Sequence, residues 1–337
     1  MTNRGVKGGF VVCLWSCLAG IGSLSGAHFE GTGTINYAGY SGCIVLENKD
    51  ARVVLDPNCG GRVLEYAWKG DNVIWLNPKE DGWLYGGPGA ASIDPGGGRF
   101  DIGPEQVIPA HPVLFLGRWK ADITGPRSAR LISEKDPVVG VQVVREFRLD
   151  KKTSRLRCTQ TIRNVSAETK HWFHWSRTLA VGGGICVVPL NPASRFPKGY
   201  IYYGPGGSIL YRPAEQPNVR IREGFLEITG VPVQPKFGFD SYAGWFCYLT
   251  RGNLLFVKRF PVYPERVYGE MAAITVSIFY TDRLCELEPI GPRENIAPGG
   301  AVSFTEDWWI LPYPFPEGPG QLDLKGLQIF VERNARP

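Results

Sequence analysis

The sequence consists largely of short runs of alternating apolar and polar residues, which turns rich in glycine and proline interrupt. Alternation is clearest in residues 141–150 and 155–164, and residues 43–48 and 51–56 are short apolar-rich runs between turns. No stretch sustains the 3.6-residue apolar period of an amphipathic helix, so no long helix is expected. With 43 Gly and 27 Pro among 337 residues, the chain has turn formers for many short strands. The pattern predicts an all-β protein.

The length alone permits one large β domain or two domains of ordinary size, because β-sandwiches and barrels often exceed 200 residues as one unit. Neither an internal repeat nor a shift in composition marks a boundary along the chain. We therefore expect residues 28–337 to form a single domain.

The N-terminal residues 1–27 have the pattern of a targeting signal. Arg4 and Lys7 precede an apolar run over residues 10–21, and a small-x-small cleavage site ends at Ala27. We expect export to the periplasm or the exterior, with cleavage after Ala27 and no membrane span afterwards. An uncleaved membrane anchor and a lipoprotein site at Cys17 are the alternatives.

Charge and cysteine content exclude some partners. Loss of residues 1–27 removes two basic residues and no acidic one, so the net charge falls from +5 to +3. Such a mild charge does not favour nucleic acid as a partner. The six cysteines beyond the signal are widely spaced without a CxxC pair, which argues against a zinc site. Some could form disulfides after export, and the alternative is that they are small buried apolar residues.

A histidine- and tryptophan-rich strand is expected over residues 170–181. The two-residue period of a strand places Trp172 and His174 on one face, and Trp175 and Arg177 on the other. Histidine titrates near neutrality and is suited to acid–base chemistry, although a lone histidine in a strand can equally have a structural, hydrogen-bonded role.

A second strand places Glu286 and Glu288 on one face and the apolar residues between them on the other. A face with two carboxylates could line a cleft. These glutamates with His171 and His174 form a nominal metal-ligand set. Residues three apart in a strand point to opposite sides, however, so no metal site is expected.

Three segments carry a resemblance to a known family: GGGRFDIGPE at residues 96–105, RNVSAETKHWFHWSR at residues 163–177, and CELEPIGPRENIAPGGAVSFTEDWWIL at residues 285–311. Together they resemble the galactose mutarotase-like (aldose 1-epimerase-like) superfamily, in particular an uncharacterised branch of it. The resemblance extends over roughly residues 42–311. It implies a large antiparallel β-sandwich in which a curved sheet forms an open carbohydrate cleft.

The resemblance also implies roles for individual residues. Glu288, which precedes a proline, corresponds to the general base of the epimerases, and His174 corresponds to the general acid. Arg99 in the glycine-rich loop corresponds to an arginine that binds sugar hydroxyls. Where epimerases have a Tyr-Phe pair after the histidine, this chain has Trp175 and Ser176. The other candidates for substrate contact are His111, Asp240, Glu286 and Trp172.

The function expected from these features is anomer interconversion in a sugar or an oligosaccharide end, without a cofactor. The base would remove the proton of the anomeric hydroxyl while the acid protonates the ring oxygen, so that the ring opens and closes again. A non-catalytic carbohydrate-binding protein is one alternative, since the ten tryptophans could stack on sugars as well as fill the core. A polysaccharide lyase-like activity on the same fold is another. The sequence does not indicate an oligomeric state.

Overall fold

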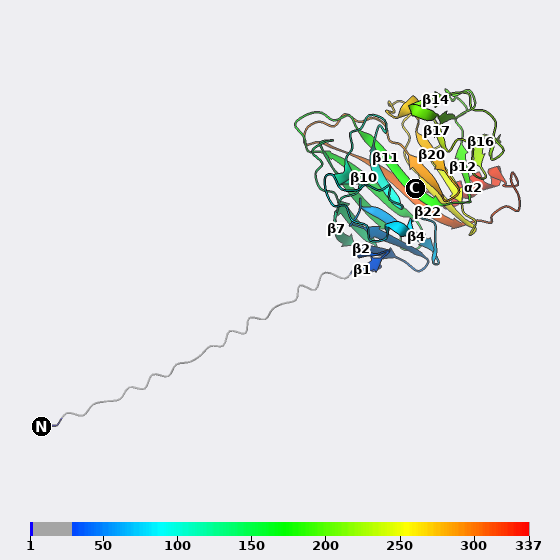
Figure 1. Cartoon of the computed structure of the whole chain (residues 1–337). Helices are drawn as coiled ribbons and strands as arrows, with labels where there is room; N and C mark the ends of the chain where they lie inside the picture. The colour runs from blue at the N-terminus through cyan, green and yellow to red at the C-terminus, as the bar shows by residue number, and fades with distance from the viewer. Residues whose placement is uncertain (3–28, 337) are drawn as a thin grey trace.

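The structure, a computed structural model, describes residues 1–2 and 29–336. Two large antiparallel sheets pack face to face, with residues 201–228 and the C-terminal helix toward one end of the molecule (Figure 1). The prediction of an all-β sandwich is confirmed. Residues 3–27 of the predicted signal lie outside the described residues. Within the described part of the chain, no helix has the length and apolar character needed to cross a membrane.

The first sheet, here called sheet A, has strands from both ends of the chain. Its central strands β6, β11 and β21 come from distant parts of the sequence. In spatial order sheet A contains β1 (Thr32–Tyr37), β2 (Tyr40–Glu47), β3 (Ala51–Asp56), β4 (Arg62–Trp68), β6 (Gly98–Gly103), β11 (Phe173–Val181), β21 (Leu284–Pro289), β20 (Val276–Tyr280), β17 (Lys236–Phe239), β13 (Ile201–Tyr203) and β14 (Ile209–Leu210), with β5 (Asp71–Asn72) beside β4.

The second sheet, sheet B, packs against the inner face of sheet A. In spatial order it contains β15 (Val219–Arg222), β16 (Phe225–Ile228), β12 (Ile185–Pro189), β18 (Trp245–Leu249), β19 (Leu254–Arg259), β22 (Ala301–Pro312), β10 (Leu156–Asn164), β9 (Val141–Leu149), β8 (Ser128–Ile132) and β7 (Lys120–Gly125). The helical segments are short: α1 (Pro112–Phe115), α2 (Leu324–Asn334), η1 (Pro78–Glu80), η2 (Pro205–Gly207) and η3 (Met271–Ala273).

The hairpin of β9 and β10 shows how the sequence pattern produces the sheets. Leu149 lies opposite Leu156, and the Asp150 carboxylate closes the turn between them by accepting hydrogen bonds from the backbone of Lys152 and Thr153. Along β10, buried residues alternate with exposed or half-buried ones. One face of the hairpin therefore enters the core and the other faces solvent, as the alternating sequence predicts.

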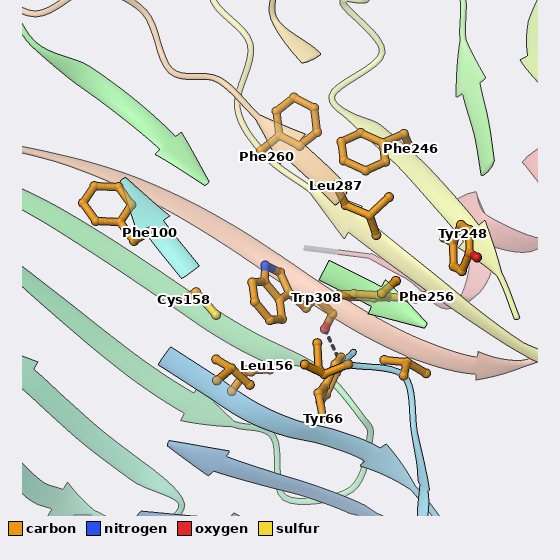
Figure 2. Packing of buried hydrophobic residues seen from close by; sticks show 14 of the residues in the cluster. Tyr66, Phe100, Leu156, Cys158, Phe246, Tyr248, Phe256, Phe260, Leu287 and Trp308 are labelled. Atoms are coloured by element: carbon orange, nitrogen blue, oxygen red, sulfur yellow. Dashed lines mark hydrogen bonds between the residues drawn. The ribbon is translucent and has the colours of Figure 1, made fainter. Parts of the chain in front are cut away.

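The core between the sheets is rich in aromatic residues. Phe256 and Trp308 from sheet B pack edge to face, with ring centroids 5.6 Å apart, and Tyr66 from sheet A contacts both rings (Figure 2). The neighbouring Trp309 points the other way and packs beneath α2 on the outer face of sheet B. The six cysteines within the described residues are all free and buried, so they act as small apolar residues.

Polar groups are also enclosed between the sheets. Lys258 from sheet B forms a fully buried ion pair of 3.0 Å with Glu306, and its ammonium donates to the hydroxyls of Ser176 and Thr178 on β11. His174 lies on this same interior face of β11. Its ring stacks on Phe304 at 5.6 Å, and neither ring nitrogen makes a hydrogen bond of normal geometry. Burial lowers the pKa of His174 to about 3.

This buried histidine should make stability depend on pH. The unfolded chain binds a proton at His174 below the ordinary pKa of 6.5, whereas the folded chain resists it down to about 3. Stability is therefore complete above the ordinary pKa and falls as the pH drops toward 3. We expect the wild type to lose about 2 kcal/mol between pH 7 and pH 5 that His174→Leu does not lose.

Urea denaturation of both proteins at the two pH values measures this difference. The matched control is His171→Gln, because His171 is exposed and bonds only the side chain of Asn295 within the described residues. This control should keep the pH dependence of the wild type. Parallel pH profiles for the wild type and His174→Leu would show that the interior histidine does not cause the effect.

Candidate functional site

A cleft of about 620 Å³ opens on the outer face of sheet A, over β6 and β11. The glycine-rich loop before β6 forms one wall through Tyr85 and Ile93, and the segment after β6, including Pro112 and Phe115 of α1, forms another. The structure thus places the glycine-rich loop at the cleft.

Strand alternation determines which side chains lie beneath the cleft. Trp175 and Arg177 of β11 line the cleft, and Asp101 of the adjacent strand β6 lines it as well. The register pairs Trp175 with Asp101 and Arg177 with Arg99 across the two strands. On β21, at the other side of β11, Glu286 projects to the same face. Charged side chains from three neighbouring strands are thereby brought together under one opening.

Two arginines share the carboxylate of Glu286. Nε of Arg177 donates to Glu286 Oε1 at 2.8 Å, and Nη2 of Arg99 donates to the same oxygen at 3.1 Å. Arg99 also donates to Asp94 in the cleft wall. Burial alone would raise the pKa of Glu286, but the two guanidinium groups outweigh it and hold the pKa below its ordinary value. Glu286 is therefore a permanent anion that positions Arg177 at the cleft.

His111 and Asp101 form a hydrogen-bonded pair in the cleft. His111 Nε2 lies 2.6 Å from Asp101 Oδ1, and Nδ1 lies 2.7 Å from the carbonyl oxygen of Pro109. Both nitrogens thus face acceptors, an arrangement that suits the doubly protonated ring. Burial alone would lower the pKa of His111, but the hydrogen bond and the charge of Asp101 raise it above its ordinary value. This histidine can hold a proton in the cleft near neutral pH.

Glu288 lies under Trp175, whose indole Nε1 donates to Glu288 Oε2 at 2.7 Å. The carboxylate is fully buried, and its Oε1 has no hydrogen-bond partner among the described residues. Burial, followed by the nearby negative charge of Glu286, raises the pKa of Glu288 to about 7. The two carboxylates of β21 therefore differ: one stays ionised, and the other can gain or lose a proton near neutrality.

Lys236 of β17 closes this side of the site. Its ammonium lies 2.5 Å from Glu105 Oε2, and it sits over the rings of Trp175 and Tyr203 at 5.3 and 5.0 Å. Burial alone would lower the pKa of Lys236, but Glu288 and Glu105 raise it. A cation is thus retained next to Glu288.

The structure brings together part of the predicted site. His111 lines the cleft, Glu286 and Glu288 lie beneath its floor, and Arg99 is bound to Glu286. His174 is not with them. Because neighbouring residues of a strand point to opposite faces, His174 projects into the interior while Trp175, its neighbour, contacts Glu288. The predicted pairing of Glu288 with His174 across one cleft is therefore not formed.

Two further candidates also lie away from the cleft. Trp172 packs against the main core and donates from its indole nitrogen to the carbonyl of Val139 at 2.9 Å. Asp240 is buried at the end of β17, where it accepts hydrogen bonds from Ser194 Oγ and the backbone nitrogen of Arg195. The contacts of both residues hold neighbouring segments of the chain in place.

The sequence-based candidates omit several residues of the site: Trp175, Arg177, Asp101, Glu105 and Lys236. The sequence does contain a signal for Trp175 and Arg177, because alternation along residues 170–181 places both on the strand face opposite His174. Choosing that face requires knowing that β21 lies next to β11. No group of three or more His, Cys, Asp or Glu among the described residues is placed to hold a metal ion.

Comparisons with known proteins bear on the fold. No family model matches the sequence, and no curated protein matches it significantly. Among solved structures, a galactose mutarotase-like protein from Lactobacillus casei aligns over 80% of this chain and 100% of its own, with a TM-score of 0.56 at 8% identity.

Two other solved structures give the same result. A candidate aldose 1-epimerase from Escherichia coli aligns over 79% of this chain and 98% of its own, with a TM-score of 0.54 at 12% identity. A galactose mutarotase-like protein from Clostridium acetobutylicum aligns over 84% and 99%, with a TM-score of 0.54 at 10% identity. At such low identity these likenesses establish the architecture alone. The chain thus has the galactose mutarotase-like β-sandwich fold.

Proposed function

We propose that the chain is a carbohydrate-binding protein and that its ligand, a sugar or the end of an oligosaccharide, occupies the cleft over β6 and β11. The observation that carries the proposal is the composition of the cleft lining, where the half-buried ring of Phe115 and the largely buried ring of Trp175 lie next to Asp101, His111 and Arg177. Sugar rings offer C–H faces to aromatic groups and hydroxyls to charged hydrogen-bonding groups.

The polar groups of the cleft are already oriented by contacts within the protein. Glu286 holds Arg177, and Asp101 and the Pro109 carbonyl hold the ring of His111. A ligand that binds to oriented groups loses less free energy to the ordering of side chains. The cationic groups of the cleft, Arg177 and His111, already have acidic partners within the protein. This supports a neutral sugar as the ligand rather than a strongly charged one.

Binding can be tested by titrating mono- and oligosaccharides into the protein, with tryptophan fluorescence and calorimetry as readouts. We expect His111→Gln to weaken binding of the preferred sugar about tenfold, as for loss of a hydrogen bond to a charged group. The matched control His171→Gln changes an exposed histidine outside the cleft and should keep the wild-type affinity. Failure of every sugar to bind, or equal losses in both variants, would refute the assignment of the cleft.

Anomer interconversion is the second candidate, and the environment of Glu288 favours it specifically. A carboxyl group with a pKa of about 7 can act as a general base at neutral pH. His111, which also lines the cleft side of sheet A, is the candidate acid in place of His174. Glu288 is fully buried behind Trp175, however, so a sugar reaches it only if this indole moves. For this reason binding without turnover is the first proposal.

Proton NMR of the anomeric signals tests the second candidate. If Glu288 is the base, the protein should accelerate anomer exchange, with a rate that rises as the pH passes about 7 because the carboxylate is then ionised. Glu288→Gln should lower the rate by about 10²-fold or more. His174→Leu should retain it, since this residue faces the interior. Spontaneous exchange rates in the presence of wild-type protein would exclude turnover.

We also propose export, on the pattern of residues 1–27. Mass spectrometry of the mature protein from cells that express the full chain is the test. We expect a mass that corresponds to cleavage after Ala27. A mature protein that retains residues 1–27, or one that begins with a lipidated Cys17, would contradict the predicted cleavage after Ala27.

A further inference from the structure

The outer face of sheet B lies on the opposite side of the sandwich from the cleft, and α2 covers only part of it. Apolar residues of α2, including Leu327 and Val331, pack over β12, β18 and β19. The strands β7 to β10 lie beyond this cover, and their outward side chains are mostly polar. This open half of the face carries a surface that the proposed cleft function does not use.

A row of arginines crosses the border between the covered and open halves. The register places Arg148 of β9 opposite Arg157 of β10, Arg157 opposite Asp307 of β22, and Asp307 opposite Arg259 of β19. Arg155, just before β10, reaches the same aspartate. We call Arg148, Arg155, Arg157 and Arg259 the arginine row.

Asp307 is the acidic residue that holds two members of the arginine row. Arg155 binds it with two hydrogen bonds of 2.9 Å, and Arg157 binds it at 3.2 and 3.4 Å. Arg148 forms no ion pair with any described residue. Other acids lie nearby: the carboxylate of Asp150 accepts hydrogen bonds from Lys152 and Thr153 in its own turn, Glu146 lies two residues before Arg148 on the same face of β9, and Glu332 of α2 acts on the charge of Arg259. The guanidinium group of Arg148 is therefore open to a ligand, although acids lie beside the row.

The fold itself gives no reason for this arrangement. Like charges that lie directly opposite on neighbouring strands are destabilising, and exposed ion pairs add little. In the next rows β10 and β22 carry hydroxyl pairs, in which Thr159 bonds Thr305 at 3.0 Å and Thr161 bonds Ser303 at 2.8 Å, while β9 places Glu146 opposite Thr159. A pair of hydroxyl side chains at the positions of Arg148 and Arg157 would stabilise the sheet without repulsion between like charges. The presence of two arginines there therefore points to a ligand.

The surface around the arginine row is hollowed in two places that share Arg157. One hollow of about 150 Å³ is lined by Arg148, Asp150, Arg155 and Arg157, and another of about 430 Å³ lies between Arg157 and Arg259. Asp307 fixes the planes of two guanidinium groups, which is the arrangement that binds carboxylate or sulfate oxygens in pairs. Adjacent strands are ~4.8 Å apart, so Arg157 and Arg259, two strands apart, are separated by ~10 Å.

We propose that the arginine row binds an acidic polysaccharide through repeated carboxylate or sulfate groups. A ligand with several acid groups matches a row of donors spread over four strands better than a single small anion does. The mild net charge of the whole chain, +5, argues against nucleic acid as the polyanion. This surface is independent of the cleft, so its test does not depend on the proposed sugar site.

Calorimetric titration with heparin, a sulfated chain, polygalacturonate, a carboxylated chain, and neutral dextran provides the test. We expect at least one acidic chain to bind and dextran not to bind. The double variant R148Q/R157Q should weaken that binding at least tenfold, and a rise in salt should weaken binding by the wild type more than by the variant. The sugar affinity of the cleft should stay unchanged in this variant, because the row is on the other sheet.

The matched controls are the single variants R157Q and R163Q. Arg163 lies on the same strand and the same face, opposite Gln142 and Ala301, and its loss removes the same charge away from the row. R163Q should keep wild-type affinity, while R157Q should lose part of it. Equal losses in R157Q and R163Q, absence of binding to both acidic chains, or equally tight binding of a DNA duplex would overturn the proposal.

Discussion

Each strand of sheet A turns one face toward the sandwich interior and the other toward the cleft, and this two-residue alternation governs where its polar groups lie. On β11 it assigns Ser176 and Thr178 to the interior, where they receive the ammonium of Lys258, and Arg177 to the cleft, where it meets Glu286. A shift of one residue would exchange the two sets. Both the interior and the cleft therefore depend on the register of β11 with its neighbours.

Local environments give chemically similar side chains different properties. Glu286 and Glu288 are both buried on β21, yet two guanidinium groups keep the first ionised, whereas the second shares an indole hydrogen bond and has a pKa of about 7. The histidines differ in the same way. His111 bonds an aspartate that raises its pKa, while His174 lies among aromatic rings and burial lowers its pKa. Burial and neighbouring charge, rather than residue type, decide which groups can exchange protons near neutral pH.

The two outer faces of the sandwich suit different ligands. On sheet A most cations have acidic partners, and the aromatic walls of the cleft match a neutral sugar ring. On sheet B the arginine row lies on an open surface where Arg148 forms no ion pair with a described residue, so it matches an extended anion. Under the two proposals, the cleft binds the end of one carbohydrate chain and the arginine row binds along the length of another.

The sequence by itself determined the all-β class, the β9–β10 hairpin and which side chains of β11 and β21 share a face, because alternation and turn residues are local properties. It also placed Glu286 with Glu288, and Trp175 with Arg177, correctly within their own strands. Only the tertiary structure decided that β6, β11 and β21 are neighbours and that the cleft lies on the Trp175 face. Those contacts join residues far apart along the chain, and no local pattern specifies them. For this reason His174, and not His111, was predicted from the sequence as the partner of Glu288.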